Sequence, residues 1–431
     1  MRILKLKTTE AKNYINRIVN RSTCSRNLEK KIYRIIEDVR KADDAAILKY
    51  TRLFDCPGMR LKDLRVRIGE ILDSYNYVEH KALSAIEQLI ERINKFEKRL
   101  LLKSWMKERK GVMLGQYIMP LEKVGIYVPG GVASYPSSLL MCAVPAKLAG
   151  VKRIVVVSPP DKKGRLNPYL LVAANKLGID EIYKIGGAQA IAALTYGTRT
   201  VPRVDKIVGP GNIYVTLAKK AVFGKVDIDF LAGPTEVLIL ADRYANPKFI
   251  ASDLLSQAEH APDALCICIT LSSRLAQSIL KEIQVQMQSL SRKNIITLSL
   301  KKGAIIIVDD LNEGITLINQ IAPEHLQVFT RTPFSLLNKI RNTGAIFLGS
   351  YTPVSIGDYI AGPSHVLPTG GTARFFSPLS ILDFIKISNI ISCTREGLEN
   401  IGMMATRIAE IEGLDAHIKS IGVRIKKGVE A

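Results

Sequence analysis

Apolar residues recur along the chain with two different periods. Between residues 30 and 103 they are spaced three and four residues apart, which predicts amphipathic helices. After Pro120, short apolar runs bounded by glycine or proline alternate with helical stretches, and they occupy residues 124–131, 153–160, 181–187 and 206–212. Strands that alternate with helices predict an open α/β unit built on a parallel sheet. Its ligand site is expected at the carboxyl ends of the strands.

A second set of apolar runs predicts a second α/β unit of similar build. These runs occupy residues 237–242, 265–272, 304–310, 326–330 and 345–349. In the second of them, Cys266 and Cys268 alternate as they would on one face of a buried strand. The segment from about Leu379 has a largely helical pattern and too few strand runs to close a domain alone. We expect it to pack on the body or on another subunit.

Length and composition exclude two classes of protein. A chain of 431 residues with 47% hydrophobic and 23% charged residues is neither a small disulfide scaffold nor a disordered chain, and it implies two or three domains. Lysine and arginine outnumber acidic residues by 61 to 40, a net charge of +21. Nucleic acid, anionic membranes and acidic small molecules could each explain this excess. Because the charges are dispersed and aromatics reach only 6%, a compositional bias is favoured.

The cysteines and the apolar stretches indicate a cellular setting. The six cysteines form no C-x-x-C pair, the first residues lack a continuous apolar signal region, and no stretch approaches about 20 apolar residues. We therefore expect a reduced, cytoplasmic enzyme with no membrane or nucleic-acid partner.

Glycine-rich turns follow several predicted strands. No G-x-G-x-x-G dinucleotide fingerprint is present; the turns are PGG at 129–131, GGAQA at 186–190, GPGN at 209–212 and AGPTE at 232–236. Each turn could bring backbone N–H groups to a phosphate, or could simply be a tight turn. Four such turns at the ends of successive strands favour a shared ligand site.

The five histidines divide into two groups. His80 lies on an amphipathic helix, where a surface or packing role is expected, whereas the other four lie in polar motifs. Gln257 and His260 are three residues apart, so on a helix they would project from nearly the same face and could hold a metal. Two ligands do not complete a zinc site, and a polar helix face is the alternative. Asp358 and His417 could supply the missing ligands.

Glu324 and His325 form a candidate acid–base pair. Pro323 suits the first turn of a short helix, which would leave the pair just before a strand. An imidazole with a pKa of about 6.5 can take and return a proton at neutral pH. As an isolated dipeptide, Glu-His is a weak signal.

Taken together, these motifs resemble the histidinol dehydrogenase family. The resemblance is carried by VGIYVPGG, GGAQAIAALTYGT, DKIVGPGN, AGPTEVLILAD, ASDLLSQAEH, APEHL, GDYIAGPSHVLPT and the E-x-x-x-A-H of residues 412–417. They fall in the family's order, so the resemblance covers essentially the whole chain. It implies a zinc-dependent oxidation of L-histidinol to L-histidine through L-histidinaldehyde, the final step of histidine biosynthesis, with one zinc per subunit and two NAD consumed per turnover.

The resemblance also implies roles for individual residues. Glu324 and His325 would be the catalytic pair: His325 removes protons and Glu324 helps to activate water. Zinc would be bound by Gln257, His260, Asp358 and His417. NAD would contact Tyr127, Gln189 and Asn212. The substrate would contact Thr235, Gln257, His260, His325, Asp358, His365, Glu412 and His417. Thr235 stands where the family often has serine, and the hydroxyl is retained.

The implied fold is two incomplete Rossmann-like α/β domains with helical terminal segments, in an intertwined homodimer. Residues 1–25 would form an N-terminal segment, and residues 26–123 plus 236–378 a discontinuous domain with the metal and acid–base residues. Residues 124–235 would form an inserted NAD-binding domain. The helical tail over residues 379–431 would cross to the partner subunit, so that Glu412 and His417 complete the partner's site.

Two other functions compete with this interpretation. An aldehyde dehydrogenase that forms a covalent thiohemiacetal would use Cys142 as its nucleophile. A basic nucleic-acid-binding protein would bind through the net positive charge, and that contact would weaken with salt.

Overall fold

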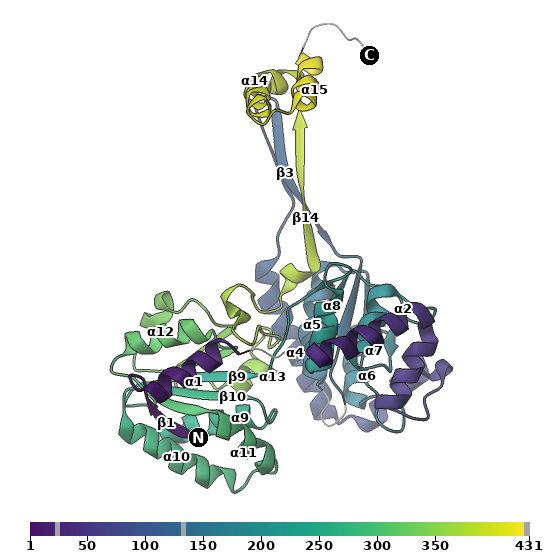
Figure 1. Cartoon of the computed structure of the whole chain (residues 1–431). Helices are drawn as coiled ribbons and strands as arrows, with labels where there is room; N and C mark the ends of the chain where they lie inside the picture. The colour runs from purple at the N-terminus through teal and green to yellow at the C-terminus, as the bar shows by residue number, and fades with distance from the viewer. Residues whose placement is uncertain (22–25, 131–134, 426–431) are drawn as a thin grey trace. The chain divides into compact units, whose positions relative to one another are not determined.

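The computed structural model of the chain describes residues 1–21, 26–130 and 135–425. The chain divides into two compact units. The first unit comprises residues 1–99 and 122–384, and the second comprises residues 100–121 and 385–431. Figure 1 labels their helices and strands.

A six-stranded sheet forms one half of the first unit. Its strand order is β1-β11-β10-β9-β12-β13, and all neighbouring strands are parallel. The strands are β1 (Arg2–Lys5), β9 (Glu236–Ala241), β10 (Leu265–Thr270), β11 (Ala304–Ile307), β12 (His325–Phe329) and β13 (Ala345–Leu348). The prediction of strands in the second set of apolar runs is confirmed. The sequence pattern does not predict β1, which adds a short edge strand.

Helices cover both faces of this sheet (Figure 1). One core lies under α9 (Pro247–Ala258), α10 (Ser273–Met287) and α11 (Lys293–Lys302), and the other lies under α1 (Thr9–Val19) and α12 (Leu311–Ile321). Successive side chains of a strand point to opposite faces of the sheet. In β10, Cys266 and Cys268 therefore enter the first core, while Ile267 and Ile269 enter the second. The predicted alternation of the two cysteines is confirmed.

A five-stranded parallel sheet forms the other half of the first unit. Its order is β6-β5-β4-β7-β8. The strands are β4 (Lys123–Tyr127), β5 (Arg153–Val157), β6 (Ile182–Tyr183), β7 (Lys206–Val208) and β8 (Asp227–Ile228). The helices that connect and follow them are α5 (Pro136–Ala149), α6 (Pro168–Lys176), α7 (Gly187–Tyr196) and α8 (Ile213–Val222). This confirms the prediction of a mixed α/β fold with parallel sheets.

The N-terminal framework helices are α2 (Arg26–Phe54), kinked at Asp43, α3 (Ile68–Asp73) and α4 (His80–Glu97). Ile32 and Ile47 of α2 share a buried core with Ala190 and Leu194 of α7. This helix therefore packs with the five-stranded sheet, which differs from the predicted grouping of residues 26–123 with residues 236–378. The apolar stripe of an amphipathic helix fits either sheet, so its period does not identify the sheet that it covers.

The second unit consists of an antiparallel sheet and two helices. The strands β2 (Trp105–Arg109), β3 (Val112–Pro120) and β14 (Ile385–Cys393) pair in the order β14-β3-β2. The helices α14 (Arg395–Ile411) and α15 (Asp415–Ile425) pack against each other (Figure 1). A largely helical tail is correct for these helices but wrong for residues 385–393. Most side chains on both faces of β14 are exposed, so no buried face gives the strand an apolar period.

Candidate active site

Glu324 and His325 lie at the amino end of β12. The preceding helix α12 ends at Ile321, and Ala322 adopts the left-handed conformation that commonly follows a helix. Pro323 follows this residue and begins no helix, so the predicted short helix at Pro323 is wrong. Proline is common just after such a cap because it cannot continue the helix. His325 is itself the first strand residue, rather than a residue just before the strand.

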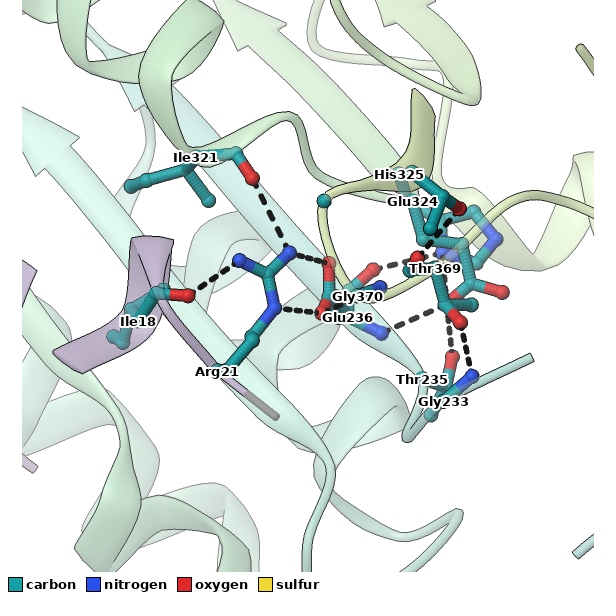
Figure 2. Close-up of polar contacts among 12 residues, drawn as sticks. Ile18, Arg21, Gly233, Thr235, Glu236, Ile321, Glu324, His325, Thr369 and Gly370 are labelled. Carbon is teal, nitrogen blue, oxygen red and sulfur yellow. Dashed lines mark hydrogen bonds and ion pairs between the residues drawn. The ribbon is translucent and has the colours of Figure 1, made fainter. Parts of the chain in front are cut away.

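Two donors hold the Glu324 carboxylate (Figure 2). The Thr235 hydroxyl donates to Glu324 Oε2 over 2.6 Å, and the backbone N–H of Glu236 donates to the same oxygen over 2.7 Å. The Thr235 hydroxyl also accepts a hydrogen bond from the Gln257 side-chain amide. Thr235 therefore connects the acid–base pair to one of the predicted metal ligands.

The two ring nitrogens of His325 have different surroundings. Nδ1 lies 2.9 Å from the backbone carbonyl oxygen of Glu236 and 3.4 Å from Glu324 Oε2. A carbonyl oxygen can only accept, so this contact assigns the proton to Nδ1 and leaves Nε2 as the basic nitrogen. Nε2 is buried with no hydrogen-bond partner among the described residues, and Asp358 Oδ1 lies 3.7 Å away. Nε2 of the imidazole therefore lies beside a carboxylate and is the nitrogen that can exchange a proton with a ligand.

The carboxylates around His325 change its proton affinity. Burial lowers the pKa of this imidazole, but the charges of Glu324 and Asp358 outweigh burial and raise it well above its usual value. Burial likewise opposes the ionisation of Asp358, yet the contact with His325 and the charges of His325, His365 and His260 hold the pKa of this carboxyl below its usual value. Both effects make Nε2 a stronger base.

The predicted metal ligands of the first unit approach the same end of the sheet. Crossover helices run antiparallel to the strands of a parallel sheet, so their carboxyl ends return to the amino ends of the strands. Gln257 lies in the last turn of α9, and His260 follows two residues after that helix ends. Asp358 lies in the last turn of α13 (Val354–Tyr359). Gln257 is buried, Asp358 is half-buried and His260 is exposed.

Within the described residues, no group of three or more His, Cys, Asp and Glu side chains could hold a metal ion. The predicted ligand set would not form such a group in the first unit, because one ligand is the Gln257 amide and His417 belongs to the second unit. Of the four predicted ligands, only His260 and Asp358 are both in the first unit and of these residue types.

His365 bridges elements of both sheets in the first unit. Its Nδ1 lies 2.7 Å from the Asp358 backbone carbonyl oxygen, and its Nε2 lies 3.0 Å from the hydroxyl of Ser138 in α5. Burial lowers the pKa of His365, so the neutral ring is favoured. The sequence analysis missed Ser138, since a serine near the start of an apolar helix carries no signal of this contact.

The three predicted NAD contacts lie at the carboxyl ends of β4 and β7 and at the start of α7. The Tyr127 hydroxyl accepts from the Gly187 N–H over 3.3 Å, and burial raises the pKa of this phenol to about 12. Gln189 is buried in the first turn of α7, and neither atom of its amide has a hydrogen-bond partner among the described residues. Asn212 caps α8 by accepting from the N–H groups of Tyr214 and Val215.

A buried ion pair fixes the GPGN turn at 209–212. Lys219 Nζ lies 2.7 Å from Asp229 Oδ1 and donates to the Gly209 carbonyl over 2.6 Å. The Gly209 N–H donates to Asp229 Oδ2 over 2.7 Å. Gly209 has a φ of 110°, and a Cβ there would lie 2.1 Å from the Tyr127 carbonyl oxygen. The pair therefore holds the backbone of this turn against β4, three residues before Asn212.

A cavity of about 540 Å³ opens on the same side of the five-stranded sheet. Its walls include Gly130, Ser158 and Pro159, which follow the ends of β4 and β5, and Asn167 at the start of α6. This agrees with the expectation that a ligand site lies at the carboxyl ends of these strands. Gly131, at the end of the PGG turn, lies outside the described residues.

The chain is similar to known proteins over nearly its whole length. The family model for histidinol dehydrogenase matches residues 19–425. The chain belongs to the histidinol dehydrogenase family. A histidinol dehydrogenase of Caldanaerobacter subterraneus is 51% identical over 95% of both chains, and one of Clostridium acetobutylicum is 50% identical over 91% of both. The crystal structure of histidinol dehydrogenase from Elizabethkingia anophelis has a TM-score of 0.93 and 38% identity, and it covers 99% of this chain and 98% of that one.

Membership of the histidinol dehydrogenase family confirms the resemblance found in the motifs. The surroundings of Cys142 also count against a covalent aldehyde dehydrogenase. Cys142 is fully buried in α5, and burial raises the pKa of its thiol well above the usual value, so the thiolate needed by a covalent aldehyde dehydrogenase is disfavoured. No helix in residues 1–21, 26–130 and 135–425 is long and apolar enough to cross a membrane.

The remaining predicted site residues, Glu412 and His417, lie in the second unit. Glu412 directly follows α14, and His417 lies in the first turn of α15. Both side chains are exposed. His80, in contrast, is exposed at the first residue of α4, away from every polar motif, as expected of a surface histidine.

Proposed function

We propose that this chain oxidises L-histidinol to L-histidine through L-histidinaldehyde, the final step of histidine biosynthesis, with NAD as oxidant and zinc in the site. One observation carries the proposal. His325 is locked through Nδ1 to a backbone carbonyl, while its buried Nε2 has no hydrogen-bond partner among the described residues and faces Asp358. A buried imidazole held in one orientation, with Nε2 available to a ligand, is suited to exchanging a proton with a bound substrate.

The first oxidation converts an alcohol to an aldehyde. The alcohol loses the hydrogen on its oxygen as a proton and one hydrogen on its carbon as a hydride. His325 Nε2 takes the proton, and the Glu236 carbonyl stabilises the imidazolium through Nδ1. The adjacent carboxylate of Glu324 stabilises the same positive charge from 3.4 Å.

The second oxidation needs a water molecule added to the aldehyde. Glu324 is suited to accept a proton from that water, because its carboxylate is oriented by Thr235 and by the Glu236 N–H. The aldehyde oxygen takes the proton that His325 gained in the first oxidation, which completes the hydrate and restores the base, and Glu324 later releases its proton to solvent. The hydrate then loses one proton to His325 and one hydride from carbon, which yields the carboxylic acid. Adjacent Glu324 and His325 thus serve both oxidations, and four electrons leave the substrate as two hydrides.

Gln257, His260, Asp358 and His417 are the proposed zinc ligands. Their donor chemistry fits zinc, which prefers imidazole nitrogen and carboxylate oxygen. The Gln257 amide nitrogen already donates to Thr235, so its carbonyl oxygen remains as the ligand atom. When bound, zinc would hold the imidazole and amine of histidinol and so fix the orientation of the alcohol carbon.

Tyr127, Gln189 and Asn212 are the proposed NAD contacts. The buried amide of Gln189, which has no hydrogen-bond partner among the described residues, supports a ligand here, because an amide left without partners costs free energy that a bound ligand can recover. When bound, NAD supplies the hydride acceptor for both oxidations. The two halves of the first unit would act as incomplete Rossmann-like domains, with residues 124–235 holding the cofactor without a dinucleotide fingerprint.

We assign the second unit to an intertwined homodimer. Its exposed side chains include many large apolar ones, which would cost free energy in contact with water. Among them, Ile391 is 74% exposed, Met403 is 80% exposed and Ile411 is 75% exposed. A second copy of this chain is the proposed occupant, because Glu412 and His417 lie in the same unit and would complete the partner's site.

The free cysteines at positions 56, 142, 266, 268 and 393 fit a reducing, cytoplasmic setting.

Removal of zinc tests the proposal. A chelator should abolish histidinol oxidation, and His260→Asn or His417→Asn should lower both bound zinc and turnover more than about tenfold. Metal content and NADH formation are measured on the same preparations. His80→Asn is the matched control, since it removes an exposed histidine at the start of α4 and should change neither quantity. Full zinc occupancy in both ligand variants would show that the ligand assignment is wrong.

A further inference from the structure

Arg21 and Glu236 form a buried ion pair beside the acid–base pair (Figure 2). Arg21 Nε donates to Glu236 Oε1 over 2.6 Å, and Nη2 donates to Oε2 over 2.8 Å. The Arg21 guanidinium also donates to the carbonyl oxygens of Ile18 and Ile321. The Glu236 side chain is 3% exposed and the Arg21 side chain is 17% exposed. A planar guanidinium that makes two parallel bonds fixes the carboxylate in direction as well as in distance.

Glu236 connects this ion pair to both catalytic side chains through its backbone. Its N–H donates to Glu324 Oε2 over 2.7 Å, and its carbonyl oxygen lies 2.9 Å from His325 Nδ1. The Gly370 N–H donates to the Glu236 carboxylate over 3.1 Å. One residue therefore orients the carboxylate and the imidazole at once, while its own side chain is held from two directions.

A strand does not need a buried ion pair at its first residue in order to form. Glu236 is the first residue of β9, and the five residues after it are apolar and buried. A buried carboxylate loses its hydration, and this loss is tolerated only where a partner compensates it. Arg21 reaches Glu236 from beyond the end of α1, 215 residues earlier in the chain. A buried ion pair adds little net stability compared with apolar residues, so a role in the site is the better explanation for its presence here.

We propose that Arg21 and Glu236 are positioning residues for this oxidation: their ion pair fixes the first residue of β9, whose backbone groups orient Glu324 and His325. Neither side chain touches the substrate. The inference rests on the proposed function, and it assigns the N-terminal segment a part in the site.

Replacement of Arg21 by alanine tests the inference in the full-length, zinc-loaded enzyme. The variant should lower kcat about 10- to 100-fold through misplacement of the catalytic pair. The KM for histidinol should change less than about threefold and bound zinc should stay at the wild-type level, because the metal ligands are untouched. Guanidinium, added far below the concentrations that unfold proteins, should restore part of kcat, since it refills the site that the truncated side chain leaves. A loss of general stability alone would give no such recovery.

Arg17→Ala is the matched control. Arg17 lies on α1, four residues before Arg21, with an exposed side chain, so its loss should leave kcat and the response to guanidinium unchanged. If Arg21→Ala does not fold, Glu236→Gln replaces it in the experiment. This variant keeps the shape of the side chain and removes only its charge, and kcat should fall more than about threefold. Wild-type kcat in a folded Arg21→Ala or Glu236→Gln enzyme overturns the inference. Failure of the proposed function itself would look different, since the wild-type enzyme would then not oxidise histidinol.

Discussion

His325→Ala is expected to lower kcat for histidinol oxidation by about 10²- to 10⁴-fold, the usual contribution of a positioned general base. The variant removes the His325 imidazole, whose Nδ1 is held by the Glu236 carbonyl. Its Nε2 has no hydrogen-bond partner among the described residues. Both oxidations release a proton to this nitrogen, so each loses its base. Steady-state NADH formation with purified enzyme measures the effect.

Zinc content separates this effect from loss of the metal site. His325 is not a proposed ligand, so the alanine variant should retain wild-type zinc. His80→Ala removes an imidazole from the surface of α4 and should retain wild-type kcat. Turnover within threefold of wild type in a zinc-replete His325→Ala enzyme would refute its role as the base.

Mixed dimers of two inactive variants are expected to recover activity. In a crossed site, the His325→Ala protomer still supplies its own His417 to the partner, and the His417→Ala protomer still supplies its own His325. One site of each heterodimer then has both residues, so a heterodimer should show about half of the wild-type activity. Random mixing gives heterodimers as about half of all dimers, so the mixture should reach about a quarter of wild type.

Two controls make the mixing experiment decisive. Each variant alone should stay inactive at the same protein concentration, and differently tagged protomers allow the heterodimer to be purified. A mixture of His325→Ala with Glu324→Ala should show no recovery, because both residues belong to the first unit. No recovery in verified heterodimers of His325→Ala and His417→Ala would mean that each site is built within one chain.

Most strands of both parallel sheets, all but the short β1 and β8, could be predicted because burial leaves a pattern in the sequence. Runs such as residues 265–269 are apolar throughout, as expected where helices cover both faces. The long strands β3 and β14 could not be predicted in the same way. Both expose most of their side chains, so no apolar period separates them from the helical segments beside them.

The site was predicted residue by residue, but its supporting contacts were not. Glu324 and His325 stand in a recognisable motif, whereas their orientation depends on Glu236 and Arg21, which lie 215 residues apart. The contact between Ser138 and His365 spans 227 residues. A lone arginine after a helix, or a serine at a helix start, has no period or spacing that could indicate such a partner. These contacts follow only from the way the strands and helices assemble.

The number of NADH molecules formed per histidinol consumed tests the central claim most directly. A site that oxidises the alcohol, hydrates the aldehyde and oxidises it again must release two hydrides for each substrate molecule. Complete conversion of a limiting amount of histidinol, followed by absorbance of NADH and by quantification of histidine, measures this ratio. We predict two NADH and one histidine per histidinol. One NADH per histidinol, with the aldehyde as the final product, would contradict the account.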